Sequence, residues 1–260
     1  MNTEKFAAIS CIHSPVHNEK SKEWLLEHLE GSKLDHFVLL GDLFDASAAS
    51  VHPDSASHCL LDEYESAAQY LEDIRSVLPK KCKLIWVLGN HDDNIQANDE
   101  RRIPGDLRSL VHWNSCQEFS QEFLRWKQIP YIKSKAGCHQ IGQVIFYHGY
   151  DCGTNSDELE GLQMAYACGG SSWRLTVRGH THRPVDITQA KRTGKILLPH
   201  YFSNVGSIGL GHEQPDYMKR KDVTMWNAGI LFGECKTASN SRLKNREWDA
   251  RLIIQQKAVI

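Results

Sequence analysis

The sequence predicts an α/β domain, and three observations support this prediction. Short apolar runs that are typical of buried strands alternate in the first half of the chain with longer amphipathic stretches that are typical of helices. Several of the apolar runs are followed at once by histidine, aspartate, asparagine or cysteine. At 260 residues the chain is long enough to bury a large core, as one large domain or two small ones.

The first predicted elements alternate between strand and helix. Segment 18–30 carries apolar residues at helical spacing and stops at Gly31, and segment 57–78 has a longer apolar face and stops before Pro79. The predicted strands around these two helices are residues 6–12, 37–40 and 84–88.

The second half of the chain departs from this alternation. Residues 93–143 contain two short predicted helices, at 105–112 and 117–128. Buried strands are expected at 144–147 and 175–177. After residue 195 only strands are expected, at 196–202, 227–234 and 248–254.

Composition excludes several classes of protein. The formal net charge of −2 carries no global signal for binding a polyanion, and no apolar run is long enough to span a membrane. The N-terminus lacks a signal-peptide pattern, so a cytoplasmic location is expected. The eight scattered cysteines include no CxxC pair, which favours free thiols in a reducing compartment.

Five predicted strands end in residue types that bind metals. Carboxyl ends of neighbouring strands in an α/β sheet open onto one crevice, where ligands collect. These strand ends therefore predict a single metal site, and the number of ligands indicates two metals. In chain order the segments are Cys11-x-His13, Gly41-Asp42-x-x-Asp45, Gly89-Asn90-His91-Asp92, His148-Gly149 and Gly179-His180-Thr181-His182.

The sequences and the order of these segments resemble the motifs of the calcineurin-like metallophosphoesterases. The signature of that family is D-x-H, GDxxD, GNH[DE], a lone His and GHxH. Four blocks match as GDLFD, GNHD, HG and GHTH, whereas Cys11 stands at the first Asp position. The resemblance spans residues 6 to about 210. It implies a four-layer α/β/β/α sandwich in a single domain, 1–260, with the last strands in the second sheet and residues 93–143 as a helical cap for substrate recognition.

The resemblance also implies a dinuclear metal centre bridged by Asp42. A hydroxide bridging the two metals would attack the phosphorus atom. Alternate residues of an extended GHTH segment would point to opposite sides and give each metal one histidine. One metal would be held by Cys11, His13, Asp42 and His182, and the second by Asp42, Asn90, His148 and His180.

His91 is not expected to bind a metal. In the family the histidine of GNHD reaches the substrate phosphate and assists the leaving oxygen as general acid, and the resemblance assigns this role to His91. Asp92 is expected to orient that imidazole and keep it protonated. Asp45 is expected to be a hydrogen-bond partner in its loop, and Arg178 a structural or surface residue.

Cys11 keeps the single negative charge that an aspartate would supply, because it can bind as a thiolate. The softer sulfur shifts the preference toward Zn(II) or Fe(II) and away from Mg(II). The expected cofactors are therefore two divalent ions, Zn, Fe or Mn. Lariat-debranching enzymes of the same superfamily also carry Cys at this position, so catalysis need not be lost. The alternative is that Cys11 leaves its metal weakly held and the enzyme slow.

Two substrate classes remain open for the expected phosphoesterase. The first is a phosphodiester of a nucleotide or nucleic acid, and the second is a phosphomonoester or pyrophosphate of a small metabolite. A remote third alternative is a non-catalytic scaffold that binds protein. Lipid pyrophosphates are disfavoured because His148 and His180 are only 32 residues apart, too close for the lid of the diacylglucosamine hydrolases. Phosphoproteins are disfavoured because protein phosphatases carry GDxVDRG and GNHE.

The predicted cap insertion, residues 93–143, contains basic residues interleaved with aromatic ones. Such a mixture suits phosphate contacts with base stacking, but it equally suits aromatic residues that pack on the body while the charges are solvated. These residues are Arg101, Arg102, Arg108, Arg125, Lys127, Lys133 and Lys135 with Trp113, Trp126 and Tyr131.

Overall fold

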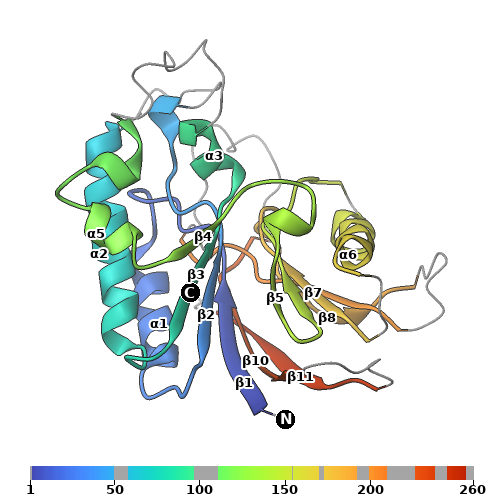
Figure 1. Cartoon of the computed structure of the whole chain (residues 1–260). Helices are drawn as coiled ribbons and strands as arrows, with labels where there is room; N and C mark the ends of the chain where they lie inside the picture. Colours follow the sequence, from blue (N-terminus) through green and yellow to red (C-terminus); the bar gives the residue numbers. More distant parts are fainter. Residues whose placement is uncertain are drawn as a thin grey trace, which may run out of the picture.

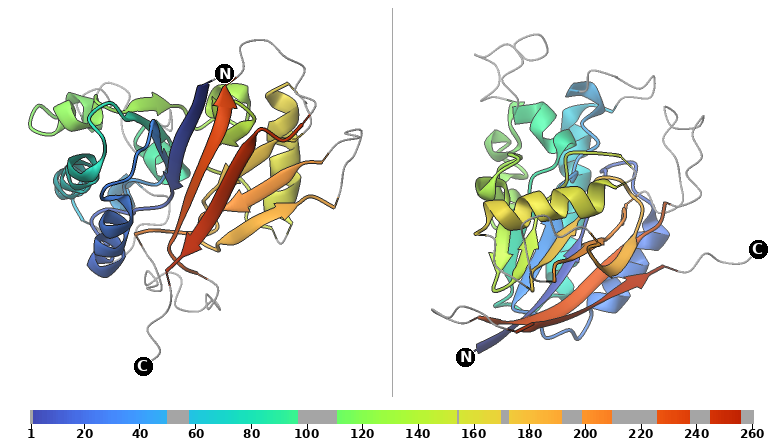
Figure 2. Two further views of the ribbon diagram at one scale, coloured as in Figure 1. Left: turned by 90° about the horizontal axis from the view of Figure 1, so that it is seen from below. Right: turned by 90° about the vertical axis from the view of Figure 1, so that its right-hand side faces the viewer.

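Two β-sheets pack face to face in the protein, with helices on both outer faces (Figure 1). The computed structural model describes residues 2–49, 58–96, 111–153, 155–169, 173–191, 199–209, 226–237 and 245–255. Seen from below, the helices of the first half and the helix of the second half lie on opposite sides of the paired sheets (Figure 2). The expected four-layer α/β/β/α sandwich is confirmed.

The first sheet has six strands in the order β11-β10-β1-β2-β3-β4. The parallel strands are β1 (Asn2–Ile9), β2 (His36–Leu40), β3 (Lys83–Val87) and β4 (Lys127–Ile129). β10 (Gly229–Thr237) pairs antiparallel with β1, and β11 (Trp248–Ile254) pairs antiparallel with β10. The place predicted for these last two strands in the second sheet is wrong, because β10 uses the free edge of β1.

The second sheet has five strands in the order β5-β6-β7-β9-β8. Its three central strands, β6 (Val144–Phe146), β7 (Leu175–Arg178) and β9 (Tyr201–Asn204), are parallel. The outer strands β5 (His139–Ile141) and β8 (Val185–Gln189) are antiparallel to their neighbours. The metal-binding segments therefore follow strands of two sheets, and not of one sheet as predicted.

Four helices longer than one turn and a half cover the sheets in the described part of the chain. α1 (Glu19–Leu29) begins at Asn18, whose side chain accepts a hydrogen bond from the backbone N–H of Ser21, and α2 (Leu60–Val77) lies beside it. α3 (Asn90–Gln96) begins within GNHD, and α6 (Ser156–Ala167) packs on β7 and β9. Among the described helices, none combines the length and apolarity needed to cross a bilayer.

The alternation of side chains along β1 shows how the layers are held together. Phe6 and Ala8 face the second sheet and belong to a core that includes Phe146 and Val177. Ala7 and Ile9 face the other way, into the core formed with α1 and α2. Where β1 to β3 run between the two layers, at residues 6–9, 37–40 and 84–87, their sequences are continuously apolar, as predicted.

The segment 111–129 belongs largely to the body of the protein. The helix predicted over 117–128 is wrong, since α5 covers only Ser120–Phe123 and the chain then enters β4. Trp113 and Trp126 are buried in the core, where the Trp113 ring lies 5.2 Å from that of Trp86. For these two tryptophans the packing alternative is correct. The helix predicted at 105–112 falls mainly outside the described residues.

Short 3-10 turns complete the described elements. They are η1 (Ser47–Ala49), η2 (Trp113–Ser115) and η3 (Lys135–Gly137). η1 closes the loop that follows GDLFD, and η3 precedes β5.

Candidate metal centre

The loops that follow β1, β2, β3, β6 and β7 meet at one place, where the two sheets present their carboxyl ends. The Cys11 and His13 backbone N–H groups donate to the carbonyls of Gly41 and Asp42, each at 3.0 Å. In the second sheet the Gly179 N–H donates to the His148 carbonyl at 3.0 Å. The predicted convergence of these segments is thus present in the backbone itself.

The backbone at the centre of this crevice is unusual. Five polar residues have positive φ angles between 53° and 67°, which non-glycine residues adopt at some energetic expense. These residues are Cys11, His13, Asp42, His180 and His182. The extended conformation predicted for GHTH is therefore wrong, although its two histidines do face different neighbours. Such clustered strain is typical of functional sites.

Two glycines of the motifs allow the loops to approach closely. A Cβ atom on Gly41 would lie 2.5 Å from His148 Nδ1, and one on Gly89 would overlap the Asp42 carboxylate. Any side chain at either position would push the loops apart. The glycines of GDLFD and GNHD therefore set the spacing between Asp42 and His148.

A first group of donor atoms lies where β1 and β2 end. Cys11, His13, Asp42 and His182 each offer one ligand atom, and these atoms lie within 4.8 Å of one another. His13 Nε2 is 3.2 Å from His182 Nε2, and Cys11 Sγ is 3.8 Å from Asp42 Oδ2. All four residues are buried, and they are the four predicted for the first metal.

A second group shares Asp42 with the first. His148 Nε2 lies 3.2 Å from Asp42 Oδ2 and 3.2 Å from His180 Nδ1. The side-chain oxygen of Asn90 is 3.1 Å from the same nitrogen. The structure therefore brings together all four residues predicted for the second metal.

The protonation of these groups suits divalent cations. Burial, with the neighbouring His148, lowers the pKa of His180 to about 3, and burial with the nearby His13 holds the pKa of His182 well below its usual value. Although burial opposes it, the nearby His148 and His91 keep the pKa of Asp42 well below its usual value. The neutral imidazoles of His180 and His182 and the carboxylate of Asp42 are donors of the kind that a cation binds, so the two groups fit metal ions.

His91 lies beside the two groups and is held by the GDLFD loop. Its backbone N–H donates to Asp42 Oδ1 at 3.0 Å, and its Nδ1–H donates to the Asp45 carbonyl at 2.6 Å. Burial disfavours the charged ring, but the Asp42 carboxylate and the Asp45 carbonyl outweigh it and raise the pKa of His91. Asp45 is thus a hydrogen-bond partner in the loop, as expected, although its carboxylate also lies within a third group of possible metal ligands, with His13 and His91.

Asp92 does not orient His91 as predicted, although its charge is one of the causes that raise the pKa of the His91 ring. Its carboxylate accepts five hydrogen bonds of 2.9–3.2 Å, from the backbone N–H groups of Asp42, Leu43, Phe44 and Gly89 and from the Trp86 indole. These donors leave no lone pair for the imidazole, which uses Asp45 in its place. Asp92 instead ties the GDLFD loop to the GNHD turn.

Arg178 is a structural residue, as expected. Three further residues at the site lie outside the five motifs. Arg178 is buried and pairs with Glu160 at 2.8 Å. Cys152 Sγ lies 3.1 Å from His180 Nε2, the Trp226 ring packs edge-on against His182 at 4.4 Å, and the Tyr131 ring lies 5.8 Å from His148. Tyr131 is one of the aromatic residues of the insertion named from the sequence, and Cys152 follows His148 by four residues, whereas Trp226 had no local signal.

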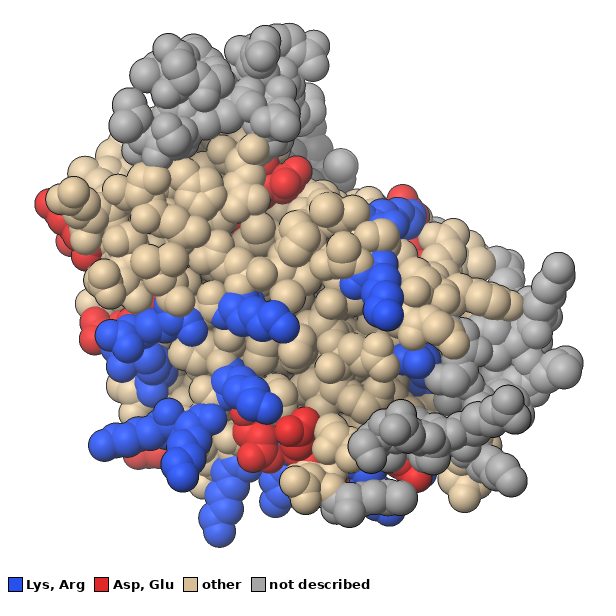
Figure 3. Space-filling model, in the orientation of Figure 1, with Lys and Arg blue, Asp and Glu red and all other residues tan. Residues whose placement is uncertain are grey.

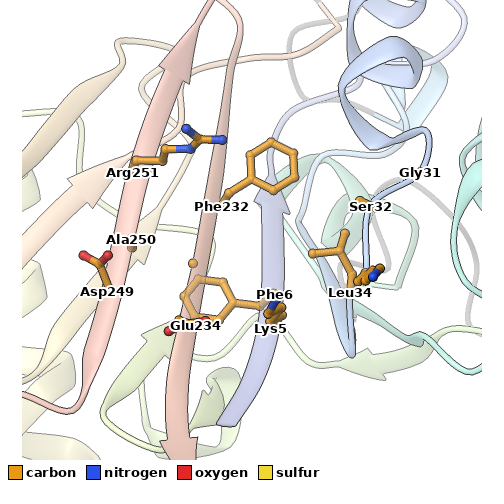
Figure 4. Close-up of a pocket in the computed structure, with 12 residues that line it drawn as sticks. Lys5, Phe6, Gly31, Ser32, Leu34, Phe232, Glu234, Asp249, Ala250 and Arg251 are labelled. Atoms are coloured by element: carbon orange, nitrogen blue, oxygen red, sulfur yellow. The ribbon is translucent and has the colours of Figure 1, made fainter.

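Two surface features lie away from this centre. Lysine and arginine side chains gather on the face of Figure 3 over the end where β1 to β3 begin, with acidic side chains among them. A groove of about 580 Å³ lies outside the first sheet, where Phe232 and Arg251 face Leu34 and Ser32 (Figure 4). The residues that line this groove include none of the donor groups described above.

The sequence model of the calcineurin-like phosphoesterase family matches residues 4–184. The chain therefore belongs to this family. A stretch of 86 residues, 32% of the chain, is 35% identical to the DNA polymerase II small subunit of Archaeoglobus fulgidus and spans only 16% of that protein. Similar solved structures include a metallophosphoesterase from Sphaerobacter thermophilus, with 16% identity and a TM-score of 0.48 over 98% of this chain and 89% of that one. The nuclease MPE from Pseudomonas putida has 11% identity and a TM-score of 0.38 over 87% and 82%.

The family and the donor groups define the class of protein. It is a member of the calcineurin-like phosphoesterase family with clustered side chains that could hold metal ions.

Proposed function

We propose that the protein is a dinuclear phosphodiesterase that acts on a nucleotide or nucleic acid. The observation that carries this proposal is the shared carboxylate of Asp42, whose Oδ2 lies 3.8 Å from Cys11 Sγ and 3.2 Å from His148 Nε2. One carboxylate thus stands between two sets of donors, as a two-metal site requires. Cys11, His13 and His182 would complete the first set, and Asn90, His148 and His180 the second.

The metals would supply the charge that phosphate-ester hydrolysis needs. When bound, two divalent cations neutralise the phosphoryl oxygens and lower the pKa of water at the site. The thiol of Cys11 favours zinc or iron over magnesium in the first set, and manganese remains compatible with both.

His91 is the proposed general acid. Its Nδ1–H is already committed to the Asp45 carbonyl, so a proton on Nε2 is the one that it can give to the leaving oxygen. The raised pKa of this ring, which the Asp42 and Asp45 oxygens produce against the effect of burial, supports a protonated imidazole before the reaction.

The choice of a diester over a monoester rests on relatives. Cys11 is shared with the lariat-debranching enzymes, and part of the chain is similar to a DNA polymerase subunit. The burial of Trp113 and Trp126 removes two of the predicted stacking residues and favours the alternative, a monoesterase or pyrophosphatase acting on a small metabolite. Tyr131, beside His148, is half-buried and its ring stacks on that of Tyr150 at 4.8 Å.

We also propose that residues 1–260 form one domain and that parts of 93–143 approach the substrate. A cytoplasmic location is proposed because the cysteines of the chain are free thiols. A scaffold without catalysis is the remote alternative, which the convergence of seven donor residues does not favour.

The test compares bis(p-nitrophenyl) phosphate with p-nitrophenyl phosphate in protein reconstituted with Zn, Fe(II), Mn or Mg. We expect faster turnover of the diester and a loss of about 10²-fold or more in His91→Ala. His58→Ala, which changes an exposed histidine before α2, is the matched control and should behave like the wild type. Preference for the monoester would support the alternative, and no turnover with any metal would contradict the enzymatic function.

A further inference from the structure

The loop that follows β6, residues 149–152, brings a thiol against one of the proposed metal ligands. Cys152 is exposed, and its Sγ lies 3.1 Å from His180 Nε2. The family motif includes His148 and Gly149 but not Cys152. This cysteine is also distinct from Cys11, which lies in the first donor group on the other side of Asp42.

The two nitrogens of His180 face different partners. Nδ1 lies 3.2 Å from His148 Nε2, within the second donor group. For Nδ1 to offer a lone pair to a cation, the proton of the neutral ring must be on Nε2. Nε2–H then needs an acceptor, and the sulfur of Cys152 is the group that stands in this position.

An oxygen atom orients another imidazole of the centre in the same way. His148 Nδ1–H donates to the Leu40 carbonyl at 2.6 Å. Outer acceptors of this kind fix the tautomer and the direction of metal-binding histidines. Cys152 occupies the equivalent place for His180, with sulfur in the role of oxygen.

Buried charges hold the loop in this position. Arg178 Nη2 donates to the Asp151 carbonyl at 2.8 Å, and Arg178 Nη1 pairs with Glu160 at 2.8 Å, both side chains being 1% exposed. Glu160 also accepts from the Tyr150 N–H at 3.2 Å. A Cβ on Gly149 would lie 2.6 Å from Arg178 Nη2, so the loop sits directly on the guanidinium.

On the far side of the loop, Arg183 Nη2 donates to the Cys152 carbonyl at 3.2 Å. The backbone carbonyls of both Asp151 and Cys152 are therefore anchored by arginines. These hydrogen bonds restrain the backbone that carries Cys152 and so favour the contact between its sulfur and His180.

We propose that Cys152 is a positioning residue, whose sulfur accepts the Nε2–H of His180 and so directs Nδ1 toward the second metal. This inference rests on the proposed dinuclear function. It predicts that the thiol controls the affinity of one of the two metal ions, although it is not itself a ligand.

Calorimetric titration of metal-free protein with Zn²⁺ tests the proposal without relying on turnover. The wild type should bind two ions, and Cys152→Ala should bind one of them about tenfold more weakly. Cys152→Ser should recover most of this loss, because its hydroxyl oxygen can accept the same proton. Cys59→Ala, which removes the other exposed cysteine, should leave both affinities unchanged.

Equal affinities in Cys152→Ala and the wild type would overturn the proposal, as would an equal loss in the alanine and serine variants. Binding of fewer than two ions by the wild type would instead contradict the dinuclear function. The ¹⁵N shifts of the His180 ring in metal-free protein then decide on Cys152 alone. In Cys152→Ala the population of the Nε2–H tautomer should fall toward its value in free imidazole. An unchanged population would overturn the proposal.

Discussion

Cys11 is the residue at which the chain departs from the motif of its family, and its surroundings determine what it can bind. Burial and the neighbouring Asp42 carboxylate raise the pKa of its thiol well above the usual value. A thiol so placed gives up its proton only to a strongly bound cation. The side chain is therefore either a thiolate ligand of the first metal or a protonated thiol that leaves this metal weakly held.

Replacing Cys11 with Asp distinguishes these two roles. If the thiolate binds the first metal, Cys11→Asp should lower the affinity for Zn²⁺ about tenfold relative to Mn²⁺. The metal content of protein reconstituted in an equimolar mixture measures this preference. Cys59→Asp, at an exposed position, is the matched control. Unchanged metal content and preference in Cys11→Asp would contradict the thiolate ligand.

Asp92 is expected to act on stability and on the positions of the loops. In Asp92→Asn one oxygen is replaced by an NH₂ group, which would face up to three of the N–H groups that the carboxylate now accepts. Each buried N–H left unsatisfied costs about 1–3 kcal/mol, so we expect a loss of several kcal/mol in the free energy of unfolding. Urea unfolding of metal-free protein checks this, with the neighbouring Asp93→Asn as control. Equal stability of the two variants would show that Asp92 does not hold the loops.

At the scale of elements, the two long helices of the first half and the strands before the motifs are present as predicted, whereas a short predicted helix and the sheet of the last two strands are wrong. α1, α2 and the strands before the motifs lie close to their predicted ranges. The helix expected at 117–128 is wrong because Trp126 and Ile129 are drawn into the core at the edge of β3. Apolar spacing in so short a segment fits a helical turn and a strand equally well.

α2 is tied to the loop after GDLFD by Glu63, and this tie depends on pH. Its buried carboxylate accepts from the Ala46 N–H at 2.7 Å, and burial raises its pKa from 4.5 to about 7. Because the pKa of Glu63 is higher in the folded state, protonation of Glu63 stabilises this state. The stabilisation is complete below pH 4.5 and is lost as the pH rises to about 7.

We therefore expect Glu63→Gln to remove a fall in stability between these two pH values, of about 3 kcal/mol at most. Chemical unfolding of metal-free protein at several pH values measures the difference between variant and wild type. Glu65→Gln changes an exposed carboxylate of the same helix and should keep the wild-type profile. Parallel profiles for wild type and Glu63→Gln would contradict the raised pKa.

At the scale of the whole molecule, the site exists because two sheets end at one crevice. The first sheet supplies Cys11, His13, Asp42 and Asn90, and the second supplies His148, His180 and His182. Metal ions bound between these residues would connect the sheets in addition to the apolar core between them.

Removal of metal should accordingly lower the stability of the whole domain. A ligand present at 1,000 times its dissociation constant stabilises the folded state by about 4 kcal/mol, so the chelated protein should melt several degrees lower. Thermal unfolding with and without a chelator gives the shift, and Asp42→Asn, which removes the shared carboxylate, should show little of it. An identical melting temperature with and without metal would contradict a site that spans the two sheets.

The sequence by itself determined the class of fold and the seven proposed ligands, because short motifs after apolar strands specify both the residue types and their place at strand ends. The tertiary structure decided which sheet the last strands join, since β1 and β10 pair across more than 220 residues of chain. It also decided that His91 bonds to Asp45, that Trp113 and Trp126 are buried, and that Cys152 meets His180. These outcomes depend on how distant segments pack against one another. Local periodicity does not predict such packing.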